Sequence, residues 1–337
     1  MNISNLDTDN AWCVSQEDMR KNVESHCSIG RKQFKKIIHS YLFFHLFFIG
    51  LFLMQVIGFC ILLTFHLHSP LIPFSLAGLI LTAFAYLILL IYFQAKKPEQ
   101  FIALQNSFMR LCHQAIPLHL APSEAHLFLA HAAYRFASHL HQDGLDEIAI
   151  KPSTLALNHL LQKAVWVFHR NDLHKMQEML FLVSIREHIE LIKKTPTNVE
   201  VHASLAHAYV ALSKLYLARV DEGLVKEAEE QFKTTAQRAI QEFHIIDHFS
   251  PNDPWVHAQL ASCYRDLNMI QKETESYEVI LKLCPNDKEI MFRLGILYFK
   301  QGLCGRGLEM YEKLLALRFS RAHELLEFYD LHPIHAV

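Results

Sequence analysis

The chain has 337 residues, of which 51% are hydrophobic and 20% charged, and its formal net charge is -2. This charge balance lacks the basic excess by which nucleic-acid-binding proteins hold phosphate, so no nucleic-acid partner is expected. Only 10 Gly and 11 Pro are present for turns, which argues against an all-β fold. We therefore expect an all-α chain whose excess of hydrophobic residues is concentrated in one region.

The first 36 residues are polar and have no sustained hydrophobic period, so we expect this segment to be largely disordered. It is not a cleavable secretory signal, because the apolar run after it begins only near Tyr41 and is too long. The segment ends in a basic cluster formed by Arg31, Lys32, Lys35 and Lys36.

Residues 37–95 contain no Asp, Glu, Lys or Arg. The runs 41–65 and 75–93 are long enough to cross about 30 Å of hydrocarbon as helices, with Pro70 and Pro73 in the turn between them. We therefore predict a two-helix transmembrane hairpin over 37–95. A buried hairpin of a soluble domain is the alternative, although an uncharged run of this length is rare in such a core.

The charges around this hairpin predict its orientation. Basic residues flank it on both outer sides, at 31–36 and at Lys96 and Lys97, whereas the connecting turn has none. By the positive-inside rule both termini are then cytoplasmic.

The rest of the chain shows a helical period at moderate hydrophobicity and no alternating run of strand length. Seven cysteines occur without a CxxC pair, so we expect reduced thiols. We predict a helical linker over 96–122, with its helix at 98–116, and further helices at 123–141, 153–169, 172–194, 198–219 and 224–248.

A 34-residue period organises the last part of the chain. In residues 254–287, Leu260, Ala261 and Tyr264 share one helical face, and Pro285 ends a second amphipathic helix. A short helix pair of this kind cannot bury its apolar face alone, so neighbouring pairs should stack on it.

One period later, Leu294, Gly295 and Tyr298 repeat the first face, and Gly302 marks the turn to the second helix. This pattern resembles the tetratricopeptide repeat. It departs from the family at Glu273, which stands where alanine is usual early in the second helix.

The same register continues upstream if insertions are allowed. Leu205, Ala206 and Tyr209 place a repeat at 199–253, and Leu129 and Ala130 indicate a more distant one at 123–198. The repeat domain would then span 123–337.

The insertions lie near 135–171 and 210–230, and their helical period favours longer helices over loops that cover a groove. Residues 321–329 should form a capping helix over the last apolar face.

The resemblance implies a superhelix whose first helices line a concave groove for a peptide or partner helix, without catalytic residues or a cofactor. Aromatic and guanidinium groups at such positions suit an amphipathic segment with a carboxylate. Chaperone C-terminal tails are not expected, because Glu289 stands where the clamp for them needs a basic residue. The groove positions of the family fall on His207, Val210, Trp255, Gln259, Ser262, Arg265, Phe292, Arg293, Ile296 and Phe299.

Twenty-three histidines raise the question of a metal site. His244 and His248 lie four apart, as two zinc ligands on one helix face would, but no second cluster completes the ligand set. No Gly-rich phosphate loop, His-Glu-x-x-His or Gly-x-Ser-x-Gly motif occurs. We therefore predict neither a metal site nor an enzyme.

The function that the sequence favours is a membrane-anchored scaffold in a bacterial inner membrane that binds a peptide or partner protein. A second hypothesis comes from the hairpin, which resembles the bilobed segment of chlamydial inclusion membrane proteins. That resemblance implies a secreted protein in an inclusion membrane, facing the host cytosol and recruiting host factors. A His-rich metalloprotein or enzyme is the third hypothesis.

Overall fold

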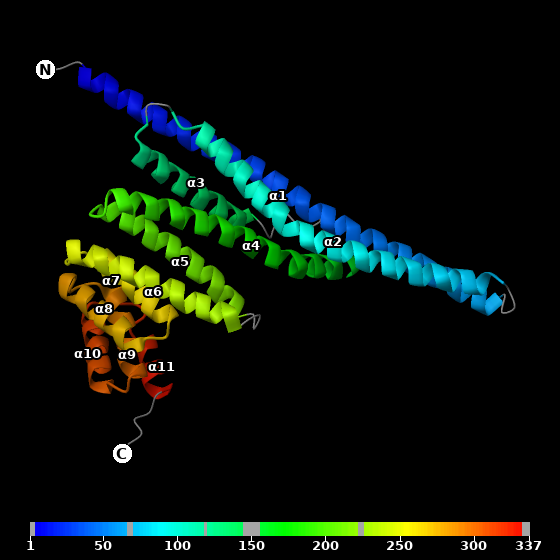
Figure 1. The fold of residues 1–337 in the computed structure, drawn as a ribbon. Helices are drawn as coiled ribbons and strands as arrows, with labels where there is room; N and C mark the ends of the chain where they lie inside the picture. The colour runs from blue at the N-terminus through cyan, green and yellow to red at the C-terminus, as the bar shows by residue number, and fades with distance from the viewer. Residues whose placement is uncertain (1–3, 66–69, 118–119, 144–155, 222–225, 332–337) are drawn as a thin grey trace. The chain divides into compact units, whose positions relative to one another are not determined.

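In the computed structural model, every regular element of the residues described is an α-helix, as expected (Figure 1). The description covers residues 4–65, 70–117, 120–143, 156–221 and 226–331. The chain divides into two compact units, Met1–Ser184 and Ile185–Val337. The helices are α1 (Ser4–Phe65), α2 (Leu71–Gln114), α3 (Pro122–Asp143), α4 (Ala156–Lys194), α5 (Val199–Asp221), α6 (Lys226–Phe249), α7 (Pro254–Asp266), α8 (Ile270–Leu283), α9 (Lys288–Lys300), α10 (Cys304–Ala316) and α11 (Glu324–Leu331).

Two long helices open the first unit. α1 runs for 62 residues from Ser4, so it includes nearly all of the segment that we expected to be largely disordered. α2 runs for 44 residues and passes through Pro98, so it joins the predicted second span to the predicted linker helix. The predicted turn lies partly outside the residues described, and α2 begins directly after Pro70.

Buried contacts explain why both helices are longer than predicted. Outside the apolar run, α1 and α2 carry buried side chains that recur at helical spacing. The rings of Phe34 on α1 and Phe101 on α2 are 5.7 Å apart. We call this paired region, residues 20–41 and 93–114, the neck. Its buried residues are Val23, Cys27, Phe34, Ile38 and Tyr41 on α1 and Phe101, Leu104, Phe108 and Cys112 on α2.

α3 packs against both helices of the neck. The ring of Phe136 lies 4.5 Å from that of Phe108 and against Gly30, where an added Cβ would come within 2.6 Å of Phe136 Cζ. Arg135 Nη1 also pairs with Glu24 Oε1 at 3.2 Å. The missing side chain at Gly30 therefore lets α3 approach α1 closely.

α4 is one helix of 39 residues where two were predicted, and the start of the first predicted one lies outside the residues described. Gln177 Nε2 donates to the carbonyl of Ala137 at 3.1 Å, and Asp172 pairs with Lys97 of the neck. The described parts of the predicted insertion, 135–143 and 156–171, thus belong to α3 and α4.

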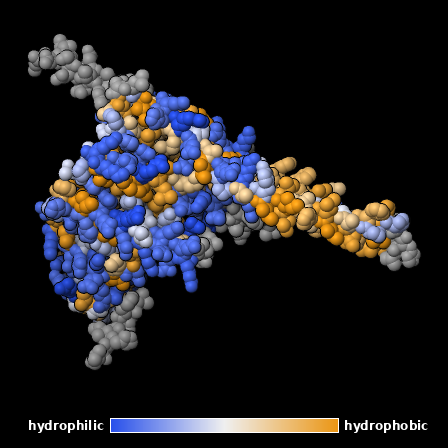
Figure 2. Space-filling model, viewed as in Figure 1, coloured by the Kyte–Doolittle hydropathy of each residue, from blue (hydrophilic) through white to orange (hydrophobic). Residues whose placement is uncertain are grey.

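Beyond the neck, α1 and α2 form what we call the apolar hairpin, residues 42–65 and 71–92. Both helices are long and apolar enough to cross a membrane, with mean hydropathies of 2.7 and 2.5 in their most apolar windows. None of either window is buried. Figure 2 shows the hairpin as a continuous hydrophobic surface.

The second unit is a stack of helix pairs, and two of its pairs repeat at 34 residues. Asp253 and Asp287 cap α7 and α9, each accepting a hydrogen bond from the backbone N–H two residues later, at 2.9 and 3.0 Å. Asn268 and Gly302, also 34 residues apart, have positive φ values of 56° and 74° at the turn within each pair. The predicted turn at Gly302 is confirmed, and Asn268 adopts the same left-handed conformation.

α5 and α6 form a longer pair upstream, of 23 and 24 residues. The insertion in the predicted repeat at 199–253 therefore lengthens both helices, as its periodicity indicated. α5 and α6 bury one face against each other along this length, including Leu205, Phe232 and Phe243.

A buried histidine secures the start of the first helix in two successive pairs. His202 Nδ1 lies 2.6 Å from Glu242 Oε2, and its Nε2 lies 2.9 Å from the carbonyl of Pro196. His257 Nε2 lies 3.3 Å from an Asp247 carboxylate oxygen and 3.4 Å from the carbonyl of Pro251. Each imidazole thus joins a first helix to the carbonyl of the proline before it and to a carboxylate of a second helix.

α11 caps the stack, which confirms the predicted capping helix. Its Leu325 is fully buried and lies against Gly295, at a distance of 2.6 Å from the position of a Cβ there. A second close approach occurs at Gly307 of α10, where a Cβ would lie 2.7 Å from both Cδ1 and Cζ of Phe299. The two glycines therefore set the spacing between these helices.

We predict that Gly307→Ala destabilises the second unit, whereas Gly305→Ala on the same helix does not. Alanine gains up to about 1 kcal/mol of helix propensity over glycine at either position. At Gly307 the new methyl group clashes with a buried ring, and overpacking of this kind costs about 1–3 kcal/mol. At Gly305 nothing lies within 4 Å of the added Cβ. Denaturant unfolding followed by circular dichroism measures both variants; equal stabilities would contradict the packing described here.

Candidate interaction surface

The first helices of the pairs, α5, α7 and α9, carry the residues predicted to line a groove. We call the surface formed by these ten predicted residues the first-helix surface. His207, Trp255, Arg265 and Arg293 are exposed. Half-buried positions are Val210, Gln259, Ser262 and Ile296, and buried positions are Phe292 and Phe299.

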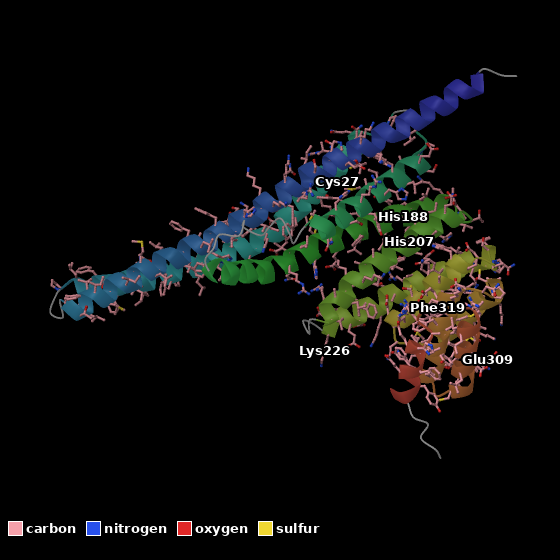
Figure 3. All side chains as sticks on the ribbon, turned by 180° about the vertical axis from the view of Figure 1, so that it is seen from behind. Cys27, His188, His207, Lys226, Glu309 and Phe319 are labelled. Atoms are coloured by element: carbon pink, nitrogen blue, oxygen red, sulfur yellow. The ribbon has the colours of Figure 1, made fainter. Side chains whose placement is uncertain are left out.

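An aromatic corner joins α5 to α7 on this surface. The Trp255 ring lies 5.6 Å from that of His207 and 6.0 Å from that of Phe243 on α6 (Figure 3 labels His207). Phe243 is fully buried, whereas 39% of Trp255 is exposed. The indole therefore has a packed side and a side open to a ligand, as binding anchors commonly do.

The local sequence fixes Trp255 at the first turn of α7. Asp253 accepts a hydrogen bond from the Trp255 backbone N–H, and Pro254 occupies the first helical position, where its missing N–H costs nothing. The indole is thus held at the helix start by a cap that does not depend on a partner.

Partial burial lowers the pKa of His207, and the nearby Lys214 ammonium lowers it further. The imidazole is therefore neutral near pH 7, when it packs on Trp255 as an aromatic ring rather than as a cation. Lys214 was not predicted as a surface residue, although it lies seven residues after His207, two turns along the same face of α5.

The thiol of Cys263, which α7 also carries, is not reactive. Burial raises the pKa of Cys263 to about 12, and the neighbouring Asp266 carboxylate acts in the same direction. Burial also raises the pKa of Asp266, against the opposing charges of Lys214 and Arg265. A thiol with such a pKa stays protonated and is a poor nucleophile.

Arg265 is not available to a ligand in the way predicted. Its Nε donates to Glu273 Oε1 at 3.0 Å and its Nη2 to the Tyr277 hydroxyl at 2.6 Å. The Glu273 side chain is only 7% exposed. Tetratricopeptide repeats usually have alanine at the position of Glu273. Here the charge of the buried Glu273 carboxylate is compensated by the guanidinium of Arg265, eight residues earlier.

Phe292 and Phe299, also predicted as groove residues, are buried and do not lie on an exposed surface. α11 lies against α9, with the Tyr329 ring 5.6 Å from the Phe299 ring. Just before α11, the Arg321 guanidinium lies 4.6 Å from the Phe292 ring. Phe319, labelled in Figure 3, also packs on Phe292 at 5.8 Å. α11 follows α9 by about one 34-residue period, so it takes the place that the first helix of a further repeat would have. It therefore covers side chains of α9 that face this next position in the stack.

His244 takes part in packing between repeats. Its Nε2 lies 3.0 Å from the Tyr264 hydroxyl. Within the part of the chain that the structure describes, no group of three or more His, Cys, Asp or Glu residues is arranged to hold a metal ion.

No family model and no curated protein matches this chain. Among solved structures, a point mutant of MamA is 15% identical, with 68% of this chain and 98% of that chain covered, at a TM-score of 0.35. A thermophilic tetratricopeptide-repeat protein of Thermus thermophilus, TTC0263, is 18% identical, with coverages of 60% and 98% and a TM-score of 0.31. A further MamA crystal structure is 20% identical, with coverages of 44% and 95% and a TM-score of 0.26. At these values the neighbours say nothing about what this chain binds, and its tetratricopeptide-like solenoid rests on its own helix pairs.

We predict that Arg265→Ala destabilises the protein by about 2–3 kcal/mol, because it leaves the Glu273 carboxylate buried without its partner. Glu273→Ala should cost clearly less, since the guanidinium it releases is already 44% exposed and can turn to water. The double variant should therefore be more stable than Arg265→Ala alone. Denaturant unfolding of all three variants measures these differences; equal and additive costs would mean that the pair is not coupled.

Proposed function

We propose that this protein is a non-catalytic, membrane-anchored scaffold that binds a peptide or partner protein on its first-helix surface. The observation that carries the proposal is the combination, in one chain, of an uncovered apolar hairpin and a stack of helix pairs with an exposed aromatic corner.

Membrane anchoring is supported by the exposure of the hairpin. The core helix of a soluble protein would be mostly buried, whereas no residue in the most apolar windows of α1 and α2 is buried. Each Å² of apolar surface left in water costs about 25 cal/mol, so a surface of this kind requires a hydrophobic environment. A bilayer supplies it, and two helices satisfy their own backbone hydrogen bonds there.

The flanking charges support an orientation with both termini in the cytoplasm of a bacterial cell. Lys32, Lys36 and Lys96 are exposed below the apolar hairpin. Lys97 is engaged at the same end, by Asp172 and by the ring of Tyr41, whose centroid is 5.0 Å away. The positive-inside rule then places the stack of helix pairs on the cytoplasmic side as well.

Partner binding is supported by the chemistry of the first-helix surface. Trp255 and His207 form an apolar site that lacks a covering element among the residues described, and the guanidinium of Arg293 is exposed on α9. These groups suit an amphipathic segment that presents one apolar side chain and one carboxylate. Burial keeps the Cys263 thiol protonated and Glu273 engages Arg265, so neither side chain offers a reactive group to this surface.

We predict opposite accessibility for the hairpin turn and the repeats. In a variant without other cysteines, Leu71→Cys at the start of α2 should react with a membrane-impermeant maleimide added to intact bacteria that express the protein. Native Cys284 at the end of α8, which is exposed, should react only after lysis. Labelling is read as a mass shift on a gel. Reaction of both cysteines in intact cells, or of neither after lysis, would contradict the orientation.

We also predict that Trp255→Ala combined with Arg293→Ala abolishes capture of a specific partner by the full-length protein in detergent. Phe249→Ala is the matched control, because Phe249 is an aromatic residue that is 47% exposed at the end of α6. Crosslinking followed by mass spectrometry compares the proteins recovered. The first-helix surface is the wrong site if the double variant and the control recover the same partners.

A further inference from the structure

One face of α1 carries exposed cations in line with exposed aromatic rings. Lys32, Lys36, Phe43 and Phe47 follow one another at intervals of four, seven and four residues, so at about 100° per residue they lie within about 60° around the helix axis. Both lysines are exposed. The rings of Phe43 and Phe47 are 71% and 55% exposed and stack with their centroids 6.5 Å apart. This face therefore changes from cationic to aromatic as it passes from the neck to the apolar hairpin.

Lys32 and Lys36 are open to a ligand. Neither ammonium group forms an ion pair with a carboxylate in the part of the chain that the structure describes. Lys97 on α2, by contrast, is held by Asp172. Along the sequence no Asp or Glu occurs between Glu24 and Glu99. The two ammonium groups thus keep their charge for a partner from outside the chain.

The positions of these lysines along α1 match the depth of a headgroup layer. Headgroups occupy about 5–8 Å on each side of the hydrocarbon core. Lys36 is the last charged residue before the uncharged run, and Lys32 lies about 6 Å further along the helix at 1.5 Å per residue. Figure 2 shows the hydrophobic surface of the hairpin giving way to hydrophilic residues at its base. With the hairpin in a bilayer, both ammonium groups lie at the depth of the lipid phosphates.

α2 carries a cation at the same boundary. The Lys96 ammonium donates to the Tyr92 hydroxyl at 3.2 Å and lies 5.5 Å from the centre of the Tyr92 ring. Because side chains on a helix lean toward its N-terminus, this contact directs the ammonium toward the apolar hairpin. Tyrosine is enriched where hydrocarbon meets headgroups. Lys96 therefore adds a third cation to this layer.

We propose that Lys32 and Lys36 bind the phosphate of an anionic phospholipid in the leaflet on the side of the chain termini, while Phe43 and Phe47 contact its acyl chains. Ammonium groups form charge-assisted hydrogen bonds to phosphate oxygens. A zwitterionic lipid offers the same phosphate but carries a cation of its own, so lysines at this depth favour an anionic lipid. The inference rests on the proposed anchoring, because only a hairpin in a bilayer brings this face of α1 to the headgroups.

Quenching of a tryptophan by brominated lipid measures which lipid occupies this face in the full-length protein. All variants carry Phe in place of Trp12, Trp166 and Trp255, and Phe43→Trp then adds one reporter at the proposed site. The protein is reconstituted in phosphatidylcholine vesicles that contain increasing fractions of acyl-brominated phosphatidylglycerol or acyl-brominated phosphatidylcholine. The two quenching curves give the relative affinity for the two lipids. We expect a preference for phosphatidylglycerol of about fivefold, the effect of one lysine near an anionic leaflet.

Two controls show whether the preference belongs to this site. Lys32→Gln with Lys36→Gln in the reporter protein should bring the preference close to one. Lys282→Gln with Lys288→Gln, which changes two exposed lysines of the second unit, is the matched control and should leave the preference as it is. A reporter at Phe65→Trp, at the opposite end of the uncharged run, should be quenched equally by the two lipids.

The outcomes separate this proposal from the anchoring. Quenching of both reporters with no preference at Phe43→Trp would overturn the lipid site and leave the anchoring in place. If neither reporter were quenched, the anchoring itself would be wrong. A preference that survives the Lys32 and Lys36 substitutions, or that the control pair reduces equally, would mean that these two lysines do not hold the lipid.

Discussion

In each unit a phenylalanine ring packs directly on a glycine and sets how closely two helices approach. In the first unit, Phe136 of α3 lies on Gly30 of α1 and so reaches Phe108 of α2. In the second, Phe299 of α9 lies on Gly307 of α10. In each case a missing side chain brings two helices close enough for one aromatic ring to fill the space between them. The spacing between α1 and α3 and between α9 and α10 follows from these two contacts.

The sequence predicts the features that are local. The repeat at 254–287 is visible because its caps, turn and apolar spacing all lie within 34 residues, and one step along the chain finds the same features again at Asp287 and Gly302. The uncharged run over 37–95 is local too, so two long apolar helices could be predicted there. The helical period of the insertions is local as well, and their described residues do belong to longer helices.

Features that depend on distant partners were missed. The start of α1 looks like a polar, unstructured segment until α2 and α3 cover Val23 and Cys27, and no pattern within residues 1–36 indicates those partners. Pro98 looks like a helix boundary, yet Phe101 continues to pack on Phe34 beyond it.

The surroundings of three predicted site residues could not be predicted for the same reason. Sequence spacing correctly placed Phe292, Phe299 and Arg265 on first helices, but it could not show what lies over them. Tyr329 of α11 covers Phe299, and Phe319 and Arg321, just before α11, cover Phe292. Glu273 and Tyr277 engage the arginine. The eight-residue separation of Arg265 and Glu273, across a turn between two helices, was the signal that could have identified this pair.

The length of α1 gives the hairpin a second structural role. A helix of 62 residues extends for about 93 Å at 1.5 Å per residue, roughly three times the hydrocarbon thickness of a bilayer. The part outside the uncharged run forms the neck, on which α3 packs through Phe136 and α4 through Asp172. Within the first unit, the apolar face of α3 is thus covered by the neck, through Phe136 on Gly30 and Phe108, and not by a neighbouring helix pair. A helix that packs in this way does not need the residue pattern by which regular repeats stack on one another. This explains why the repeat pattern at 123–198 is the weakest in the chain.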